Sequence, residues 1–411
     1  MDARTPECSV IIPVFNKWEL TGDCLKSLRE HSSEHDLEVI VVDNASSDAT
    51  ITELEPLGKA LFGERFTAVR FSENKNFGPG CNAGAEAATA PFLFFLNNDT
   101  LLTPGWFPPL IRALNADETL GAVGPLLLYG DNTVQHLGVA YIASGSGVHL
   151  YRSFPRDHPV VSKSRKFQSL TGAALLLRAD LFRRCGEFYQ GYKNGYEDQE
   201  LCARIRQHGK TLRCIPESVV YHLESQSSGR HDDENHNLAL FRGRCRGLVH
   251  TDIHHHVMRD GFTVFIDDLL SICPAMSEED RAALAARAKG LPLSELLPLA
   301  VQNPYWPEGY ERIAEFFERA DNFDHAIAAQ IKLAEIQPTI SRYMNVRKLL
   351  EYVPAPPWKD LFENKLAAMK QYAADKHLAL RKVNAVRNYY RSGHDPFLEA
   401  LYARKLKKMF P

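Results

Sequence analysis

The sequence has no apolar run close to the ~20 residues that a helix needs to span a bilayer. Its first residues, MDARTPECSV, are polar and unlike a secretory signal. Net charge is also small, −3 over 411 residues, which excludes a molecule-wide field that would collect nucleic acid or anionic lipid. We therefore expect a cytoplasmic protein that binds no nucleic acid and touches the inner face of the cell membrane at most peripherally.

Cysteine is scarce and scattered. The eight cysteines include no C-x-x-C pair, which excludes the common zinc and thioredoxin-like motifs and is consistent with reduced thiols. A hydrophobic fraction of 45% with 24% charged residues is typical of a globular chain. Because 411 residues are too many for one ordinary compact domain, we expect two, over residues 1–257 and 258–411.

Short apolar runs and helical patterns alternate in the first half. Residues 9–14 and 38–42 are rich in β-branched side chains, which is typical of strands buried on both faces of a sheet. Leucines at helical spacing lie between these two runs. Further strands are expected over residues 68–71 and 92–96, with a helix of small residues over 82–88. The alternation predicts an α/β fold with an open, doubly wound, mixed sheet.

Polar residues follow the expected strands. Asn16 comes after the first strand, Asp43 ends the second, and residues 97–99 (NND) come after the fourth. Ligands of open α/β sheets lie beyond the carboxyl ends of the strands, so these residues are expected to line one crevice. Residues 74–82 (NKNFGPGCN) also follow a strand, but their Gly-x-Gly lacks the third glycine of a dinucleotide loop.

The middle of the chain is less regular. Residues 130–159 are rich in Gly, Ser, His and Pro and predict an excursion over the sheet, of the kind that shapes an acceptor pocket. Residues 170–178 predict a strand in which Gly172 permits close approach of a ligand or another backbone. A helix is expected to begin at Glu197 and to end at Gly209.

The second half is rich in helix formers, which predicts an all-α domain after residue 257. Within it, residues 306–338 resemble one tetratricopeptide repeat, with Tyr310, Ala314 and Pro338 among the matching positions. A single repeat indicates a helical hairpin. Residues 404–410 are basic with interleaved apolar side chains, a pattern that suits contact with anionic lipid or a solvated helix end.

Short motifs in the first part of the chain resemble those of family 2 glycosyltransferases, which have the GT-A fold. The motifs occur in that family's order, and the resemblance ends at about residue 250. The chain is most similar to a bacterial branch that includes rhamnosyl- and galactofuranosyltransferases of surface polysaccharides. The motifs are VIIPVFN (10–16), VVDNASSD (41–48), NKNFG (74–78), NND (97–99), YED (196–198) and, as a weaker match to that branch, NLALF (237–241).

The resemblance implies that several residues bind a nucleotide-sugar donor. Asp43 would accept a hydrogen bond from the imide N–H that uracil and thymine share; the alternative is a turn or helix-cap carboxylate, which is common after a strand. Asn16 would line the base pocket, where Pro13 sets the path of the chain. The other expected donor contacts are Asn76, Gly78, Asn82, Asn97, Asn98 and Gly172.

A divalent cation is also implied. The segment ending in Asp99 replaces the Asp-x-Asp of many related enzymes, so one of the two usual acidic residues is missing. Asp99 and the distant His222 are the expected ligands, because Mn²⁺ or Mg²⁺ needs few protein ligands when diphosphate oxygens fill its coordination shell. The imidazole favours Mn²⁺. A histidine after an apolar strand is otherwise commonly structural.

Asp198 is the expected general base. It lies in the first turn of a helix, where the dipole and unpaired N–H groups keep a carboxylate ionised. The alternative is a helix cap, which also explains acidic residues at this place. Glu197 is expected to orient the acceptor, and Glu200 to pair with Arg204 one turn further on.

Three polar segments remain. Residues 225–236 predict a loop that closes over the donor as a lid. His254, His255 and His256 have no metal-ligand spacing and are expected to form a solvated turn. The arginines expected to help hold phosphate are Arg230, Arg242, Arg244 and Arg246.

These features predict a single inverting displacement, in which Asp198 deprotonates an acceptor hydroxyl and a sugar moves from a UDP- or dTDP-sugar to a glycan or lipid-linked glycan. A sugar nucleotidylyltransferase is a second interpretation, but it requires a glycine-rich basic loop where this chain has PVFNK (13–17). A non-catalytic interaction protein is a third, and retention of Asp99 and Asp198 argues against it. The helical domain is expected to dock a partner enzyme, a second subunit or a membrane-bound acceptor.

Overall fold

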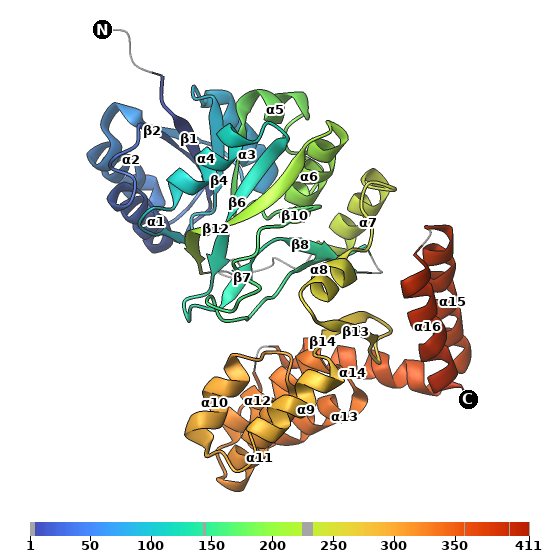
Figure 1. Cartoon of the computed structure of the whole chain (residues 1–411). Coiled ribbons are helices and arrows are strands. Elements are labelled where there is room, and N and C mark those ends of the chain that lie inside the picture. Colours follow the sequence, from blue (N-terminus) through green and yellow to red (C-terminus); the bar gives the residue numbers. More distant parts are fainter. Residues whose placement is uncertain (1–4, 143–144, 224–232, 357, 394, 411) are drawn as a thin grey trace. The chain divides into compact units, whose positions relative to one another are not determined.

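The computed structural model describes residues 5–142, 145–223, 233–356, 358–393 and 395–410. The chain divides into two compact units, the first formed by residues up to 141 together with 145–250, and the second by the rest of the chain (Figure 1). The domain boundary expected at residue 257 stays a prediction.

A mixed β-sheet forms the centre of the first unit. Its strands are β1 (Cys8–Val14), β2 (Leu37–Asp43), β3 (Phe66–Arg70), β4 (Phe92–Leu96), β5 (Thr100–Leu102), β6 (Leu120–Leu128), β7 (Val134–His136), β10 (Lys166–Phe167), β11 (Ala174–Arg178) and β12 (Thr211–His222). Over the described residues the order is β10-β12-β6-β11-β4-β1-β2-β3, with β5 beside β12 and β7 beside β6. Strands β1 to β4 pair in parallel, whereas β11 is antiparallel to β4 and β6.

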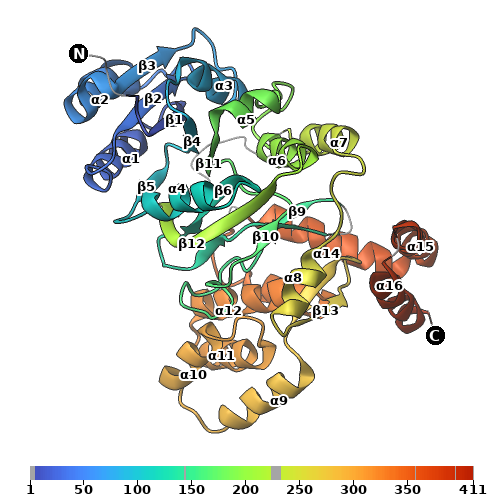
Figure 2. The same cartoon turned by 45° about the horizontal axis from the view of Figure 1, so that its top comes forward.

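Helices pack against both faces of this sheet (Figure 2). Alternate residues of β1 point to opposite faces: Val10 and Ile12 join a core with α1 and α4 side chains, while Ile11 faces Gly84 of α3. The strand is therefore a continuous apolar run, and the predicted α/β class with a mixed sheet is confirmed. The helices are α1 (Trp18–Glu30), α2 (Thr50–Phe62), α3 (Phe77–Ala87), α4 (Phe107–Ala116), α5 (Ala179–Arg184), α6 (Glu197–Gln207) and α7 (Glu234–Arg244).

Two elements begin several residues away from their expected starts. The strand expected from residue 170 begins only at Ala174, because the backbone just before it bonds elsewhere: the amide of Gly172 donates to Asp198. Helix α3 begins at Phe77 rather than at residue 82, directly after Asn76, whose φ of 69° reverses the chain. Both differences lie at the edge of the sheet where ligands are expected.

The excursion after β6 contains a small sheet of its own. Strands β8 (Val139–Tyr141) and β9 (Gly147–His149) pair antiparallel. The hydroxyl of Tyr141 lies 2.7 Å from Oγ of Ser169 and donates to Oε1 of Gln199 at 3.1 Å. These bonds fix the excursion beside the first turns of α6, next to Asp198.

The second unit is helical, as predicted, and also contains an antiparallel pair of strands, β13 (Thr263–Ile266) and β14 (Ile272–Ala275), that the sequence did not predict. These strands are four residues each, too short to give a period. Residues 306–338 contain α11 and α12, and their assignment as a tetratricopeptide repeat stays a prediction. The helices are α8 (Ile253–Arg259), α9 (Glu278–Arg287), α10 (Leu293–Val301), α11 (Pro307–Arg319), α12 (Phe323–Ile336), α13 (Ile340–Leu349), α14 (Lys359–Ala374), α15 (Lys376–Ser392) and α16 (Pro396–Met409).

One expectation about this unit is wrong. His254, His255 and His256 do not form a solvated turn but lie in helix α8, where His254 is only 2% exposed. The burial follows from helical spacing, since Ile253, His254 and Val257 share the inner face of the helix. Among the described helices, none is both long and apolar enough to cross a membrane.

Candidate active site

The carboxyl ends of parallel strands bring polar segments to one edge of the sheet. Val14 of β1 pairs with Asp43 of β2, and the amide of Asn44 donates to the carbonyl of Val14 at 2.8 Å. The amide of Asn97, just after β4, donates to the carbonyl of Ala173 at 2.9 Å. Because β11 is antiparallel to β4, the residues that precede β11 reach the same edge.

Asp99 and His222 face each other at this edge. Nε2 of His222 lies 3.1 Å from Oδ1 of Asp99, and the two side chains are only 5% and 12% exposed, respectively. Strand pairing causes the approach, because β12 is antiparallel to β5 and sets His222 opposite Thr100. Nδ2 of Asn97 lies 3.3 Å from the same imidazole nitrogen. An imidazole and a carboxylate that are 123 positions apart in the chain thus share one largely buried space.

Gln135 of β7 orients the imidazole of His222. Oε1 of Gln135 lies 2.7 Å from Nδ1 of His222, and Nε2 of Gln135 donates to the backbone carbonyl of His222 at 2.9 Å. Since that carbonyl can only accept, the second bond assigns the donating atom of the Gln135 side chain as Nε2 and the accepting atom as Oε1. Nδ1 of His222 therefore carries a proton, and Nε2 is the ring nitrogen that faces Asp99. Sequence reasoning missed Gln135, because nothing in its irregular segment marks it.

This donor set is suited to a divalent cation. A neutral imidazole nitrogen beside a carboxylate oxygen is a common pair of ligands for Mn²⁺, and a hydrogen bond to the remote ring nitrogen is the usual support of a metal-bound histidine. Asp99 and His222 are thus the residues that would hold the ion.

Asp198 is held by two backbone amides. The amide of Gly172 donates to Oδ2 at 2.7 Å, and the amide of Gln199 donates to Oδ1 at 2.7 Å. Both bonds favour the ionised carboxylate. The side chain is partly exposed at the start of α6, so it remains accessible to a substrate. The carboxylate of Asp198 is therefore held by two segments of the chain, and its role as a base stays a prediction.

Glu197 points inward. It is 3% exposed, and a Cβ atom on Gly78 of α3 would lie 3.6 Å from its Cγ. Burial raises the pKa of Glu197 to about 7, the charge of Asp198 adds to the rise, and backbone N–H groups of residues 194, 195 and 197 act in the opposite direction. The two neighbouring carboxyl groups thus differ, one buried against α3 and one at the surface of the site. The role of Glu197 in orienting an acceptor stays a prediction.

Asparagine side chains fix the loop that leads to Asp198. The amide of Asn82 donates to the carbonyl of Phe188 at 2.9 Å and accepts from the amide of the same residue at 3.0 Å. Asn237 of α7 clasps Lys193 in the same way, at 2.9 and 3.0 Å. Each buried asparagine thus replaces the backbone partner that a loop residue lacks. The expected donor contact of Asn82 stays a prediction, beside this observed structural one.

Asn76 and Asn194 join the two loops at the edge. Nδ2 of Asn194 donates to Oδ1 of Asn76 at 3.2 Å, and Oδ1 of Asn194 accepts from the amide of Phe77 at 2.9 Å. Both asparagines have positive φ, 69° and 55°, a conformation that asparagine tolerates better than most residues. The start of α3 and the start of α6 are therefore tied together. Asn194 had no signal in the sequence beyond its place in a turn-rich segment.

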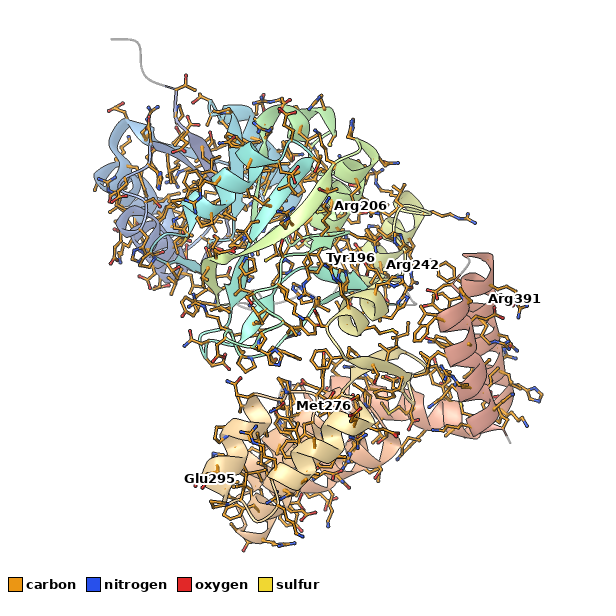
Figure 3. The ribbon with its side chains drawn as sticks, in the orientation of Figure 1. Tyr196, Arg206, Arg242, Met276, Glu295 and Arg391 are labelled. Atoms are coloured by element: carbon orange, nitrogen blue, oxygen red, sulfur yellow. The ribbon has the colours of Figure 1, made fainter. Side chains whose placement is uncertain are left out.

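Helix α7 is bound to α6 by an ion network. Glu200, which is 2% exposed, pairs with Arg204 at 2.6 Å, as predicted, and with Arg244 of α7 at 2.9 Å. Arg244 also lies over the ring of Tyr189, so its guanidinium has partners on α6 and in the preceding loop; its help in holding phosphate stays a prediction. Tyr196 immediately precedes α6 (Figure 3). The centroid of its ring lies 5.2 Å from the centroid of the Phe241 ring.

The residues expected around the nucleotide base are held in place by hydrogen bonds to neighbouring segments. Oδ1 of Asp43, which is 2% exposed, accepts from the amide of Ser46 at 2.9 Å, and Oδ2 lies 3.5 Å from Nη1 of Arg70. Oδ1 of Asn16 accepts from the amide of Ser47 at 2.7 Å. One oxygen of Asp43 thus forms a turn, as its alternative interpretation required. Recognition of a base by its other oxygen stays a prediction.

Pro13 and Asn98 hold backbone segments. A Cβ on Gly80 would lie 3.4 Å from Cβ of Pro13, so Pro13 packs directly beneath α3. Nδ2 of Asn98 donates to Oγ1 of Thr21 at 2.9 Å and fastens the segment before β5 to α1. Residues 225–232 of the predicted lid loop, including Arg230, lie outside the described residues. The loop expected over residues 234–236 is wrong, because these residues form the first turn of α7.

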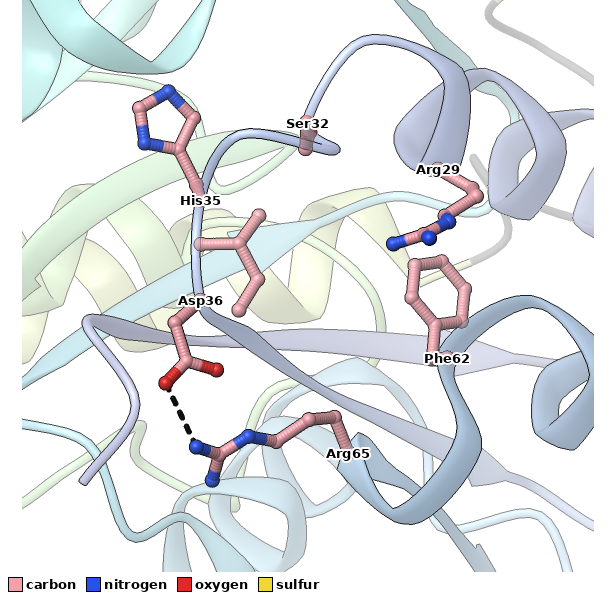
Figure 4. A pocket seen from close by; sticks show the side chains of 7 residues that line it. Arg29, Ser32, His35, Asp36, Phe62 and Arg65 are labelled. Atoms are coloured by element: carbon pink, nitrogen blue, oxygen red, sulfur yellow. Dashed lines mark hydrogen bonds and ion pairs between the residues drawn. The ribbon is translucent and has the colours of Figure 1, made fainter. Parts of the chain in front are cut away.

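A small hollow of about 120 Å³ lies elsewhere in this unit (Figure 4). Its lining includes Asp36 and Arg65, which form an ion pair of 2.7 Å, and Leu37, the first residue of β2. The hollow is therefore at the amino end of β2, whereas Asp43 and the candidate site lie at the carboxyl end. It plays no part in the site.

Comparisons with known proteins agree with the motifs. Residues 9–182 match the family described as "Glycosyl transferase family 2". The O-antigen biosynthesis protein RfbC of Myxococcus xanthus is 29% identical over 230 residues, 54% of this chain and 18% of RfbC. The uncharacterized glycosyltransferase YfnE of Bacillus subtilis is 27% identical over 290 residues, 60% of this chain and 73% of YfnE. The chain thus spans less than a fifth of RfbC.

A solved structure, that of GalNAc-T7 with UDP, GalNAc and Mn²⁺, is similar at a TM-score of 0.46 and 19% identity, over 54% of this chain and 44% of that one. The family match covers β1 through most of α5, which includes Asp43, Asp99 and Gly172. The predicted resemblance is confirmed as a match to the family model over this stretch of the chain. The chain is thus similar to family 2 glycosyltransferases over residues 9–182, which is less than half of its 411 residues.

Proposed function

We propose that this protein transfers a sugar from a UDP- or dTDP-sugar to a hydroxyl group of a glycan acceptor, with inversion at the anomeric carbon and with the help of Mn²⁺ or Mg²⁺. The observation that carries the proposal is the pairing of Asp99 with His222 at 3.1 Å, on the same sheet edge as a carboxylate, Asp198, held by two amides. Donor binding and proton removal require these two sets of groups.

Asp198 is the proposed base. It removes the proton of the acceptor hydroxyl, whose oxygen forms a bond to the anomeric carbon while the bond from that carbon to the diphosphate oxygen breaks. The amides of Gly172 and Gln199 keep the carboxylate in place before and after it takes the proton. Asp99 and His222 would hold a divalent cation, whose charge would neutralise the charge that develops on the leaving diphosphate.

The donor preference follows from Asp43. A carboxylate accepts but does not donate, so it suits the imide N–H of uracil or thymine. Oδ1 of Asp43 accepts the turn bond from Ser46, and Oδ2 lies near Arg70. Oδ2 is therefore the oxygen proposed to accept from the base. Asn16, Asn76, Asn97 and Asn98 are the proposed neighbours of the nucleotide and its sugar.

The proposed acceptor is a growing surface polysaccharide or its lipid-linked precursor at the cytoplasmic face of the membrane. The motifs of the rhamnosyl- and galactofuranosyltransferase branch support this, and RfbC, an O-antigen biosynthesis protein by its name, is among the similar proteins. We assign the helical unit to docking of this acceptor, a partner enzyme or a second subunit. The basic residues near its end, 404–408, suit a negatively charged surface.

A donor screen tests the proposal. UDP-, dTDP- and GDP-sugars are incubated with the full chain and Mn²⁺, and release of nucleoside diphosphate is measured with and without excess chelator. We expect release from a UDP- or dTDP-sugar that stops on chelation and in Asp99→Ala. Release should persist in the surface variant Asp180→Ala, whose residue pairs with Arg184 in α5. Release that continues in excess chelator would contradict the metal role.

A further inference from the structure

A group of two histidines and one aspartate lies in the second unit, apart from the candidate active site. His254 and His255 belong to α8, and Asp395 is the residue before α16. One ligand atom from each of the three lies within 4.8 Å of the other two, and within the described ranges no other set of three His, Cys, Asp or Glu side chains does so.

His254 is the centre of this group. Its side chain is 2% exposed, yet neither ring nitrogen makes a hydrogen bond. Buried polar atoms in folded proteins nearly always have a partner. The ring is covered on one side by Phe397, stacked at 5.9 Å and 7°, so water has little access from there. Neither ring nitrogen of His254 is therefore satisfied by a hydrogen bond within the protein.

Asp395 approaches His254 without a hydrogen bond. Its Oδ1 accepts from the amide of Leu398 at 3.0 Å, which caps α16, while Oδ2 lies 3.2 Å from Nε2 of His254. The carboxylate oxygen and the imidazole nitrogen are thus close to each other but not aligned for a hydrogen bond.

The separation instead suits two ligands of one cation. Zn²⁺ with bonds of about 2.0–2.1 Å to nitrogen and oxygen leaves tetrahedral ligand atoms roughly 3.3 Å apart, close to the 3.2 Å between His254 and Asp395. His255 completes the set from the exposed side, with its ring centroid 3.9 Å from that of His254. Its exposure leaves room for a water molecule as fourth ligand.

We propose that His254, His255 and Asp395 bind a Zn²⁺ ion that joins α8 to the start of α16. Two imidazoles and one carboxylate form a ligand set that zinc prefers over Mg²⁺ or Ca²⁺. The joint closes a chain segment of 140 residues between His255 and Asp395, so the ion stabilises the second unit. The site is separate from Asp99 and His222 and does not depend on the proposed sugar transfer.

Zinc titration of the full chain without an affinity tag tests this. After dialysis against chelator, binding is followed by calorimetry and the bound metal is counted by mass spectrometry. We expect one Zn²⁺ bound in His222→Ala, in which the candidate active site is disabled. His255→Ala and Asp395→Ala, each added to that background, should lower the affinity at least about tenfold. His256→Ala, whose residue lies on α8 outside the group, should retain the ion.

X-ray absorption of the zinc-loaded His222→Ala protein gives a readout independent of the ligand variants. Two imidazole ligands with additional oxygen are expected. The proposal is overturned if His222→Ala binds no zinc, if His255→Ala and Asp395→Ala leave the affinity unchanged, or if the spectrum lacks imidazole scattering. Circular dichroism establishes whether each variant is folded. If a ligand variant does not fold, the X-ray absorption spectrum of the His222→Ala protein decides.

Discussion

The amide of Gly172 donates a hydrogen bond of 2.7 Å to Oδ2 of Asp198, across two segments 26 residues apart. A Cβ on residue 172 would lie 3.2 Å from Cβ of Asp198 and 3.2 Å from Cζ of Phe77. Glycine therefore permits an approach that a side chain would obstruct. The sequence suggested Gly172 as a donor contact, whereas its observed partner is the proposed base itself.

Gly172→Ala is the first prediction. The added methyl group pushes Asp198 and the Phe77 ring apart by a few tenths of an ångström, so the base loses its alignment. Turnover should fall about tenfold to a hundredfold, measured as nucleoside diphosphate release with donor and acceptor. Gly243→Ala in α7 is the matched control, since a Cβ there meets nothing within 4 Å. Equal activity of the two variants would argue against a constrained Asp198.

Gln135→Ala tests the support of the metal site. The substitution removes the bond that sets the His222 tautomer, so Mn²⁺ affinity in the presence of UDP should fall about tenfold to a hundredfold. Calorimetry measures this. The control is Gln168→Ala, because Gln168 is similarly buried and clasps the backbone of His250 in the same two-bond manner. Equal affinity losses in both variants would mean a general loss of stability.

Glu197 predicts a pH dependence of stability. Its folded-state pKa is raised from 4.5 to about 7 by burial, so the folded protein holds this proton more tightly than the unfolded chain. Stability from this residue is therefore lost as pH rises through that window. Between pH 5 and 8 the wild type should lose about 2–3 kcal/mol relative to Glu197→Gln. Urea unfolding at both values measures this, and parallel pH profiles would contradict it.

The sheet was predictable from the sequence because β1, β2 and β4 are buried on both faces and stand out as apolar runs. Asp43 and Asp99 could be predicted as site residues because they follow these apolar runs, at the carboxyl ends of the strands. Element bounds were less predictable where tertiary bonds compete with local preference. The amide of Gly172 bonds to Asp198, so β11 starts late.

The residues that position the site were not predictable. Gln135 contacts His222 across 87 positions, and Asn237 reaches Lys193 across 44. The residues that flank a glutamine or asparagine do not reveal whether its side chain bonds to a distant segment or lies exposed on the surface. His254 was misjudged for a related reason. Three consecutive histidines suggest exposure, whereas helical spacing turns the first of them inward.

The central claim, that Asp198 is the base of a sugar transfer, is tested most directly by Asp198→Asn. Donor affinity, by calorimetry with Mn²⁺, and turnover are measured on one preparation, with Asp180→Asn as the surface control. The amide keeps the size and loses the basicity, so turnover should fall about 10²–10⁴-fold while the donor Kd stays within about twofold. Near-normal turnover of Asp198→Asn would contradict the account and leave Asp198 as a helix cap.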